Sequence, residues 1–399
     1  MYVQMGKAYL FSVFDLNDYN YLKMPWRIIV EVLPSLSKVM PDSTLYILTD
    51  GKQTRKLREM FERSNNVKLI SLNNPVLRYP YKGLVQTIES LKKRFNIETL
   101  VVFSGVNIHV WMRVAKLLKI KKLVIVFLTP IYTWKELAVI AVKFIPRLLV
   151  YGTFVDFLDF VKLCYENALA RFVLPIARNI LKLNKDCDVH IIVMHHNAFS
   201  LFKRLKFKVH IVVPKLLLVE KKQRSQWLSP NEVPRIAYFG PLILARGYDI
   251  VVELSRRLPK DTPVMVTLFS RSKLTRNLLN KLSSANLNVF ERFFEDLEEI
   301  MQVAEGYDLI VLPFRFVLSD IPLVVLELTS SGTLVVTTSY SHVTKSCPNL
   351  VILDINELSD ASKVIELANF AKKIYSRYHY AISWADFVDL LKKVLRGED

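Results

Sequence analysis

The residues best placed to do chemistry together lie within Tyr307–Thr338, YDLIVLPFRFVLSDIPLVVLELTSSGTLVVTT. An apolar strand, Leu309–Leu312, precedes Pro313 and a polar loop, and the helix that follows carries one acid, Glu327. A second apolar strand is expected at Leu334–Val336. Units of this kind form parallel sheets and bind ligands at the carboxyl ends of the strands. A carboxylate there could accept hydrogen bonds from a ribose, although Glu327 could equally face solvent.

A second group occupies Ile236–Leu258, IAYFGPLILARGYDIVVELSRRL. A strand is expected at Arg235–Phe239, followed by a turn at Gly240, and Arg246 and Gly247 come just before a helix expected at Tyr248–Arg257. A fixed guanidinium beside a helix start suits a phosphate group, because the helix amides add further positive charge. The alternative is that Arg246 is an ordinary surface residue.

Polar residues also follow the strands expected in the first half of the chain. Asp15 and Asp18 come after the first strand, and His109 comes after the Ser104–Gly105 turn. Asp15 and His109 are candidate contacts for a ligand, although a lone histidine is more often structural. His195 and His196 lack a third ligand at suitable spacing, so we predict no metal site.

Strand-like and helix-like runs alternate along the whole chain, which favours doubly wound parallel sheets. A polar linker, Glu220–Val233, separates two such regions. We therefore expect an α/β protein with an N-terminal Rossmann-like domain at 1–230, a second at 231–380, and a last helix at 381–399. In the first domain, strands are expected at Ala8–Phe14, Thr44–Leu48, Val67–Ser71, Leu100–Ser104, Leu123–Leu128 and Val189–Val193.

Residues 131–186 interrupt this alternation with a long apolar and aromatic stretch that also carries cations. Charged residues such as Lys143 and Asp156 break every window long enough to span a bilayer. Arg171, Arg178 and Lys182 recur at helical spacing, so they share one face. The pattern is typical of basic amphipathic helices in a membrane interface, and the alternatives are ordinary buried helices or a cover over a cleft.

Composition indicates the cellular compartment of the protein and the charge of its partners. Residues 1–230 carry 36 Lys and Arg against 16 Asp and Glu, a net charge of +20, whereas residues 231–399 carry 19 against 21, a net charge of −2. A basic half favours an anionic partner such as membrane lipid or nucleic acid. The three cysteines are widely spaced, which indicates a reducing compartment, and the N-terminus does not resemble a signal peptide. We expect a cytoplasmic protein, peripheral on the membrane.

The two candidate segments resemble the donor domain of family 4 glycosyltransferases, which are retaining enzymes of the GT-B fold. Gly240, Arg246 and Gly247 match that family's glycine, lysine and glycine, and Glu327 matches the second acid of its Glu-x7-Glu pair. Gly332 and Thr333 match the entry into the following strand. The resemblance covers about residues 235–399, and the first 230 residues match in architecture only.

The resemblance implies a site for the diphosphate and ribose of a nucleotide-sugar. Arg246 would supply a cation, Glu327 would hold the ribose, and the amides of Leu323 and Val324 would approach the diphosphate. Two departures stand out, since Pro241 replaces the family's arginine and Ser319 replaces its first glutamate. The neighbouring Asp320 could take the place of that glutamate, and Arg271, or Lys273, could take the place of the arginine.

The resemblance implies a reaction as well. It implies two Rossmann-like domains facing a cleft, with a last helix that returns to the N-terminal domain. The chain would move a sugar, with retention and without a metal or other cofactor, from a nucleotide-sugar to a glycan or polyprenyl-phosphate-linked acceptor at an anionic membrane surface. The alternative is a catalytically degenerate GT-B protein that binds nucleic acid or another protein, although no nucleic-acid module is recognised and nucleic acid is not the expected partner. The sugar, the nucleotide base and the oligomeric state do not follow from the sequence.

Overall fold

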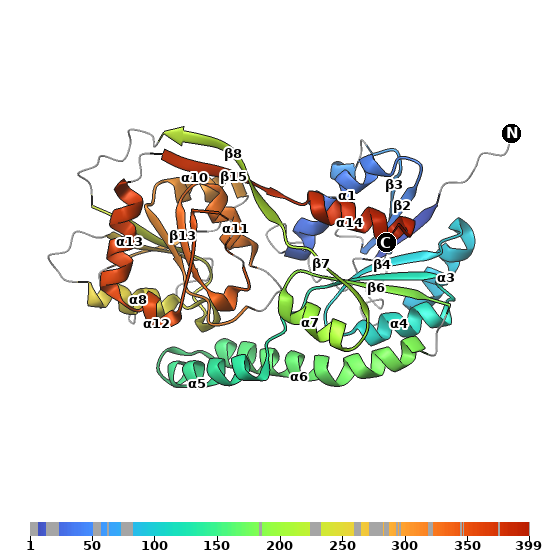
Figure 1. Cartoon of the computed structure of the whole chain (residues 1–399), viewed down its shortest axis with the longest axis horizontal. Coiled ribbons are helices and arrows are strands. Elements are labelled where there is room, and N and C mark those ends of the chain that lie inside the picture. Colours follow the sequence, from blue (N-terminus) through green and yellow to red (C-terminus); the bar gives the residue numbers. More distant parts are fainter. Residues whose placement is uncertain are drawn as a thin grey trace. The chain divides into compact units, whose positions relative to one another are not determined.

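The chain forms two compact units, each containing a parallel sheet. The first comprises residues 1–131, 165–214 and 384–399, and the second comprises residues 132–164 and 215–383. In Figure 1 each sheet is flanked by the helices that connect its strands. The computed structural model describes residues 7–12, 24–50, 57–61, 64–72, 83–182, 186–223, 233–258, 265–270, 282, 287–292, 294, 297–317, 322–343, 345, 347–373 and 376–398.

The first unit is built on a seven-stranded parallel sheet with the order β3-β2-β1-β4-β5-β6-β7. Its central strands are buried along almost their whole length, as strands covered by helices on both faces must be. The strands are β1 Ala8–Ser12, β2 Thr44–Asp50, β3 Val67–Leu72, β4 Thr99–Ser104, β5 Lys122–Phe127, β6 Asp188–Val193 and β7 Lys208–Ile211. The order reverses between β1 and β4, which makes this the topological switch point of the sheet.

The helices of the first unit carry apolar faces toward this sheet, and Trp111 of α4 is among the largest buried side chains. They are α1 Met24–Val39, α3 Gly83–Phe95, α4 Ile108–Leu117, α7 His196–Arg204 and α14 Ala385–Arg396, together with the second part of α6. The last helix, α14, contacts α1 and buries the apolar face that includes Phe387 and Leu391.

The second unit holds a six-stranded parallel sheet with the order β11-β10-β9-β12-β13-β14. The strands are β9 Arg235–Phe239, β10 Met265–Ser270, β11 Asn288–Glu291, β12 Leu309–Leu312, β13 Leu334–Thr338 and β14 Leu350–Leu353. The helices are α8 Tyr248–Arg257, α10 Leu297–Glu305, α11 Leu323–Ser330, α12 Ile355–Leu358 and α13 Ala361–Lys373. Its switch point lies between β9 and β12.

A two-stranded antiparallel ribbon accompanies the second sheet. It pairs β8, Lys215–Gln223, with β15, Ser376–Ser383, with one register shift at His379 and Tyr380. Asn349 fastens the ribbon to the sheet, because its side-chain amide donates to the carbonyl oxygens of Gly332 and Tyr378 at 2.9 and 3.1 Å.

The division of the chain differs from the expected boundaries at residues 230 and 380. The first strand of the ribbon, β8, already belongs to the second unit, because it pairs with β15. Residues 132–164 also group with the second unit, although we expected all of 131–186 in the N-terminal domain. They comprise α5, Trp134–Tyr151, and the start of α6, Phe154–Lys182. The reason is side-chain packing against the loops after β9 and β12, which sequence spacing does not reveal.

Candidate ligand-binding site

The candidate site lies where the carboxyl ends of β9 and β12 meet in the second unit. These neighbouring strands pair in parallel, with Leu309 opposite Ile236 and Ile310 opposite Ala237. Residues 240–247 follow β9, and Pro313 begins the loop that follows β12. Crevices at the switch point of an open α/β sheet are where such folds bind ligands.

The first loop is held in one shape by Tyr238 and by two glycines. The buried Tyr238 hydroxyl donates to the Pro241 carbonyl oxygen at 2.7 Å, directly after Gly240, whose φ is +152°. Gly247 has φ +73°, and a Cβ on it would collide with the carbonyl oxygen of Pro313. Only glycine tolerates both that conformation and that approach, so Gly247 lets the two loops touch.

A buried ion pair joins the second loop to the first turn of α8. Arg315 donates to both carboxylate oxygens of Asp249 at 2.5 and 2.7 Å, and both side chains are almost fully buried. Arg315 also bonds to the first loop. Its Nη1 donates to the Leu244 carbonyl oxygen at 3.0 Å, and its backbone amide donates to the Ala245 carbonyl oxygen at 2.9 Å. Arg315 is therefore committed to structure, and its charge is neutralised by Asp249.

Arg246 is the cation of the loop best placed to meet a ligand. Its guanidinium lies 4.7 Å from the centroid of the Phe314 ring, so the second loop supports it by a cation–π contact. It is half-buried at the end of the short 3-10 helix η2, Leu244–Arg246. Its positive charge also acts on Tyr238, whose pKa is raised by burial and lowered by Arg246.

Helices α5 and α6 form a hairpin that packs on this loop. The chain turns at Gly152 and Thr153, and Phe144 stacks on Phe160 with ring centroids 5.1 Å apart. Both rings contact Phe316 of the second loop, at 5.2 and 6.3 Å. These contacts explain why residues 132–164 group with the second unit.

The start of α6 contributes two acids to the loop. Asp156 is buried and accepts hydrogen bonds from the Thr153 amide and hydroxyl through Oδ2, while Oδ1 accepts from the Leu244 amide at 2.6 Å. One turn further on, Asp159 lies within the field of Arg246. Burial raises the pKa of Asp159, the charge of Asp156 raises it further, and Lys162 and Arg246 oppose that shift.

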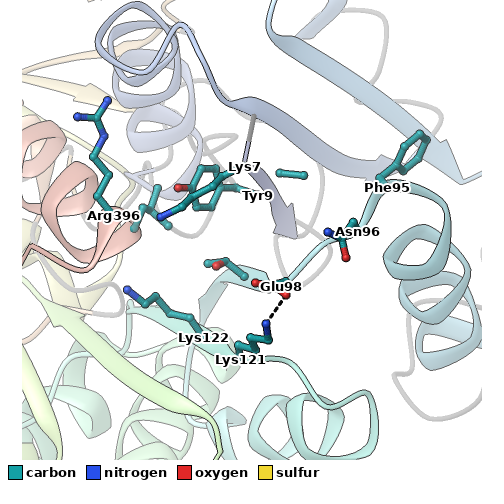
Figure 2. Close-up of a pocket in the computed structure, with 11 residues that line it drawn as sticks. Lys7, Tyr9, Phe95, Asn96, Glu98, Lys121, Lys122 and Arg396 are labelled. Carbon is teal, nitrogen blue, oxygen red and sulfur yellow. Dashed lines mark ion pairs between the residues drawn. The ribbon is translucent and has the colours of Figure 1, made fainter. Parts of the chain in front are cut away.

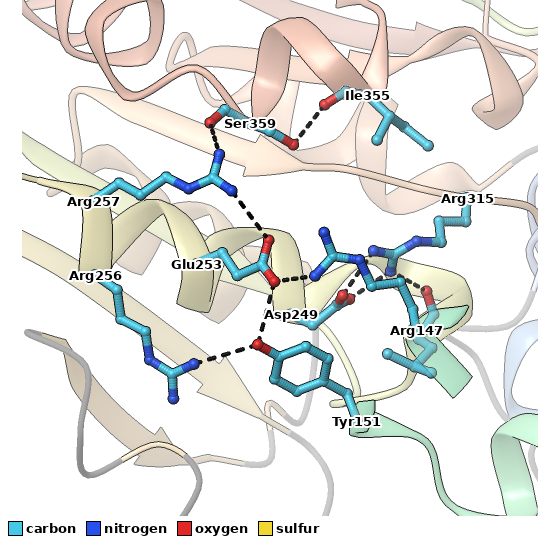
Figure 3. Close-up of polar contacts among 10 residues, drawn as sticks. Arg147, Tyr151, Asp249, Glu253, Arg256, Arg257, Arg315, Ile355 and Ser359 are labelled. Carbon is cyan, nitrogen blue, oxygen red and sulfur yellow. Dashed lines mark hydrogen bonds and ion pairs between the residues drawn. The ribbon is translucent and has the colours of Figure 1, made fainter. Parts of the chain in front are cut away.

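Polar contacts anchor the rest of the hairpin. Figure 3 shows Glu253 of α8 accepting from Arg147 and Tyr151, both of α5. Near the start of α5, the Tyr132 hydroxyl accepts from the Val317 amide at 2.7 Å and donates to the Tyr340 carbonyl oxygen at 3.2 Å. Residues 132–164 are therefore held at several points to the second unit, near the end of the sheet where a ligand would bind.

The residues predicted for the donor site fall into two places. Gly240, Arg246 and Gly247 lie in the loop after β9, and Leu323 and Val324 begin α11 after β12. Glu327 follows one turn later in α11 and is buried, which rules out the alternative that it faces solvent.

Gly332 and Thr333 lie at the other end of the sheet, because they precede β13 at its amino end. The Thr333 hydroxyl donates to the Ala304 carbonyl oxygen at 3.0 Å and accepts from Ser331. These two residues therefore shape a turn between α11 and β13 instead of lining the crevice. A strand entry is the amino end of a strand, whereas ligands bind at the carboxyl ends of a parallel sheet, so the position of these two residues disfavours a direct contact with the donor.

Four other predicted residues, Asp15, Arg271, Ser319 and Asp320, lie outside the described residues. His109 lies at the start of α4 in the first unit and is half-buried. Burial lowers its pKa, and the charge of Arg113 lowers it further. His195 caps α7 by accepting a hydrogen bond from the Ala198 amide at 3.3 Å, which is a structural role.

Sequence reasoning missed Asp156, Asp249 and Arg315. The Thr153-x-x-Asp156 spacing is a capping signal that could have located the start of α6. Nothing in the sequence shows that Asp156 reaches Leu244, or that Asp249 meets Arg315, because each pair is far apart along the chain. Among the described residues, no cluster of three His, Cys, Asp or Glu side chains is arranged to hold a metal ion.

Comparisons with known proteins identify the fold. No protein-family model matches the sequence, and no curated protein matches it either. A glycosyltransferase from Rickettsia africae superimposes with a TM-score of 0.56 at 12% identity, covering 98% of this chain and 99% of the other. Anabaena HepE in complex with UDP-glucose gives 0.54 at 12%, covering 98% and 99%. The lipopolysaccharide outer core galactosyltransferase WaaB gives 0.56 at 8%, covering 98% and 100%.

The chain therefore has the GT-B fold, and the predicted fold class, with two Rossmann-like parallel sheets, is confirmed. The likeness extends over both units. At these identities it defines the fold, and the narrower resemblance to family 4 stays a prediction.

Proposed function

We propose that this protein is a glycosyltransferase that moves a sugar from a nucleotide-sugar donor to an acceptor. The observation that carries the proposal is the loop Gly240–Gly247 at the β9/β12 switch point, with Arg246 supported by Phe314. A nucleotide-sugar carries a diphosphate, and its leaving group gains negative charge as the glycosidic bond breaks. A cation fixed at that position stabilises the transition state more than the ground state.

The start of α11 supports the same proposal. Leu323 and Val324 open the helix directly beyond the loop after β12, and a helix start favours anions. Glu327, one turn on, is the carboxylate proposed to accept hydrogen bonds from the donor ribose. Because Arg315 is occupied by Asp249, Arg246 is the cation of these two loops that we assign to the diphosphate.

We further propose transfer with retention, as the resemblance to family 4 implies. The departing phosphate then assists the acceptor, so no separate base is required. Solved GT-B neighbours support a nucleotide-sugar as the donor, since HepE is described in complex with UDP-glucose.

The test is a panel of UDP-, GDP- and ADP-sugars, with hydrolysis or transfer as the measurement and product stereochemistry read by NMR. Arg246→Ala and Glu327→Gln are expected to abolish turnover, whereas Arg256→Ala, an exposed arginine on α8, should leave it unchanged. Turnover that survives in both site variants would reject the donor site. Folded protein without turnover on any donor would favour the degenerate alternative.

The acceptor is proposed to be linked to a lipid at the membrane surface, because α6 exposes an apolar stripe. Phe154, Leu158, Val161, Tyr165, Phe172 and Ile176 are all exposed and recur every three, four or seven residues, so they share one face of the helix. On α5, Trp134, Val142, Ile145 and Leu149 form a second exposed stripe. Contiguous exposed apolar surface of this kind marks interaction sites.

Charge favours an anionic bilayer as the partner of these stripes. Lys135, Lys143 and Lys162 lie on the same two helices, and residues 1–230 carry a net charge of +20. Among the described residues, none of the helices combines the length and hydrophobicity needed to cross a bilayer. The proposal is therefore binding at the membrane surface.

Vesicle sedimentation tests this part separately. The double variant Phe154→Ser/Phe172→Ser should lose binding to phosphatidylglycerol vesicles, and rising salt should weaken binding of the unchanged protein. Leu117→Ser on α4 is the matched control, since Leu117 is 70% exposed but lies outside both stripes. Equal loss in the control, or no binding at low salt, would reject the membrane proposal.

A further inference from the structure

The first unit contains a cavity of about 320 Å³ at the amino-terminal edge of its sheet. Its wall includes residues just before or at the start of three neighbouring strands, β1, β4 and β5, and the end of α14. Figure 2 shows Lys7 just before β1, Tyr9 within it, Lys121 and Lys122 where β5 begins, and Arg396 at the end of α14. Ligand pockets in proteins begin at about 300 Å³, so the cavity has room for a small molecule.

Positive charge dominates the wall. Four cationic side chains face one acid, Glu98, and Lys121 forms an ion pair with it. Lys122 donates to the carbonyl oxygen of Val394 at 2.5 Å, near the end of α14, and thereby meets the negative end of the helix dipole.

Of the four cations, Lys7 and Arg396 are the least neutralised by the described acidic side chains. Lys7 is exposed and forms no ion pair within the part of the chain that the structure describes. Arg396 reaches only Glu398 among the described acids, at 3.8 Å and at the surface, where such pairs contribute little. Among the described residues, therefore, these two cations flank one cavity without a strong ionic partner.

The Tyr9 hydroxyl adds a neutral donor inside this wall. Tyr9 is 1% exposed, and its hydroxyl makes no hydrogen bond of normal geometry within the described residues. Ser43 lies near enough to lower the pKa of Tyr9 without the geometry of a hydrogen bond, and burial raises that pKa overall. The positive charge of Arg396 also lowers it. A buried hydroxyl is costly to leave without a partner, so a ligand atom here would be favoured.

We propose that this cavity binds a small soluble phosphomonoester or inorganic phosphate, as a dianion. Lys7 and Arg396 would neutralise the phosphate through charge-assisted hydrogen bonds, and the Tyr9 hydroxyl would donate to one of its oxygens. The site is distinct from the loop at Arg246, because every residue of the cavity belongs to the first unit. A bound dianion would link the start of β1 to the end of α14.

Isothermal titration of the full chain with inorganic phosphate and with glucose 6-phosphate, at low ionic strength, tests the site. We expect saturable binding of one equivalent, weaker at pH 5.5 than at pH 7.5 because the phosphate loses its second charge. Lys7→Ala and Arg396→Ala should each weaken binding about tenfold, and the double variant should abolish it. Both side chains are exposed, so neither variant should impair folding.

Two controls make the outcome decisive. Lys116→Ala removes an exposed lysine of α4 outside the cavity and should leave the affinity unchanged. Arg246→Ala should also leave it unchanged, which separates this site from the proposed donor site. Absence of saturable binding, equal weakening in Lys116→Ala, or loss in Arg246→Ala alone would overturn the proposal. Retained phosphate binding together with absent glycosyl transfer would leave this site standing and reject only the proposed function.

Discussion

The Asp156 carboxylate accepts a hydrogen bond from the backbone amide of Leu244, 88 residues away, at 2.6 Å. The helix start that carries Asp156 and the loop that carries Arg246 are therefore one structural unit. The Asp156 carboxylate contacts this loop from α6, and the proposed donor diphosphate would contact it at Arg246.

Asp156→Asn should destabilise the loop. An asparagine cannot serve all three donors, and a hydrogen bond to a charged group contributes about 1.5–3 kcal/mol. We expect faster hydrogen exchange in a peptide covering 240–247 and a higher KM for the donor. Thr153→Ala is the matched control, since it removes the helix cap and one donor to Asp156, at a cost of about 1 kcal/mol, but leaves the bond from Leu244 in place. Unchanged exchange at 240–247 in Asp156→Asn would contradict the assigned role.

Gly247→Ala should cost more stability than Gly397→Ala, although the two glycines have nearly equal φ angles of +73° and +75°. The left-handed conformation costs an alanine about 1–2 kcal/mol at both positions. Only at Gly247 does the new Cβ also displace the Pro313 carbonyl, whereas at Gly397 the nearest atom lies 3.5 Å away on Lys122. Thermal unfolding of both variants gives the comparison, and equal losses would show that the two loops do not need this contact.

Removing one partner of the Arg315–Asp249 pair should be more harmful than removing both. Asp249→Asn leaves a buried guanidinium without its counter-charge, and such losses are about 3–5 kcal/mol. The double variant Arg315→Met/Asp249→Leu should recover part of that loss. Urea unfolding of the single and double variants measures the coupling. Strictly additive losses would mean that the pair acts as two independent residues.

Asp159 should make the protein less stable as pH rises through its folded pKa. Burial, followed by the charge of Asp156, raises the pKa of Asp159 above the ordinary value near 3.8. The folded state therefore binds a proton more tightly than the unfolded state, and the stability gained from that proton is present at low pH and lost above the raised pKa. Asp159→Asn should remove this dependence and gain stability at pH 7 relative to pH 4.5. The same pH dependence in both proteins would assign it to another group.

Much of the fold was predictable, because apolar runs bounded by turn residues define parallel strands. The predicted strand Arg235–Phe239 and helix Tyr248–Arg257 match β9 and α8 to the residue, and Leu309–Leu312 matches β12. The antiparallel ribbon of β8 and β15 was missed, because Lys215–Gln223 lies at the end of a basic segment and pairs with a strand about 160 residues away.

The site was predictable where its residues are close in sequence and not where they are distant. Gly240, Arg246 and Gly247 were correctly expected to lie together, because one loop contains them all, and their role in binding stays a prediction. The hairpin's role was left open between a membrane surface, buried helices and a cover over a cleft. In the structure the two helices have one buried face and one exposed face. They bury Phe144 and Asp156 against the loops and expose Phe154 and Trp134.

The chain order of the two units also constrains how the protein is made. The first unit needs α14, residues 385–396, whose apolar face packs on α1. During synthesis, therefore, the first unit stays without this helix until residues 385–396 have left the ribosome, and by then the second unit already has its whole sheet. We expect the half that is translated first to be the half that completes its folding last.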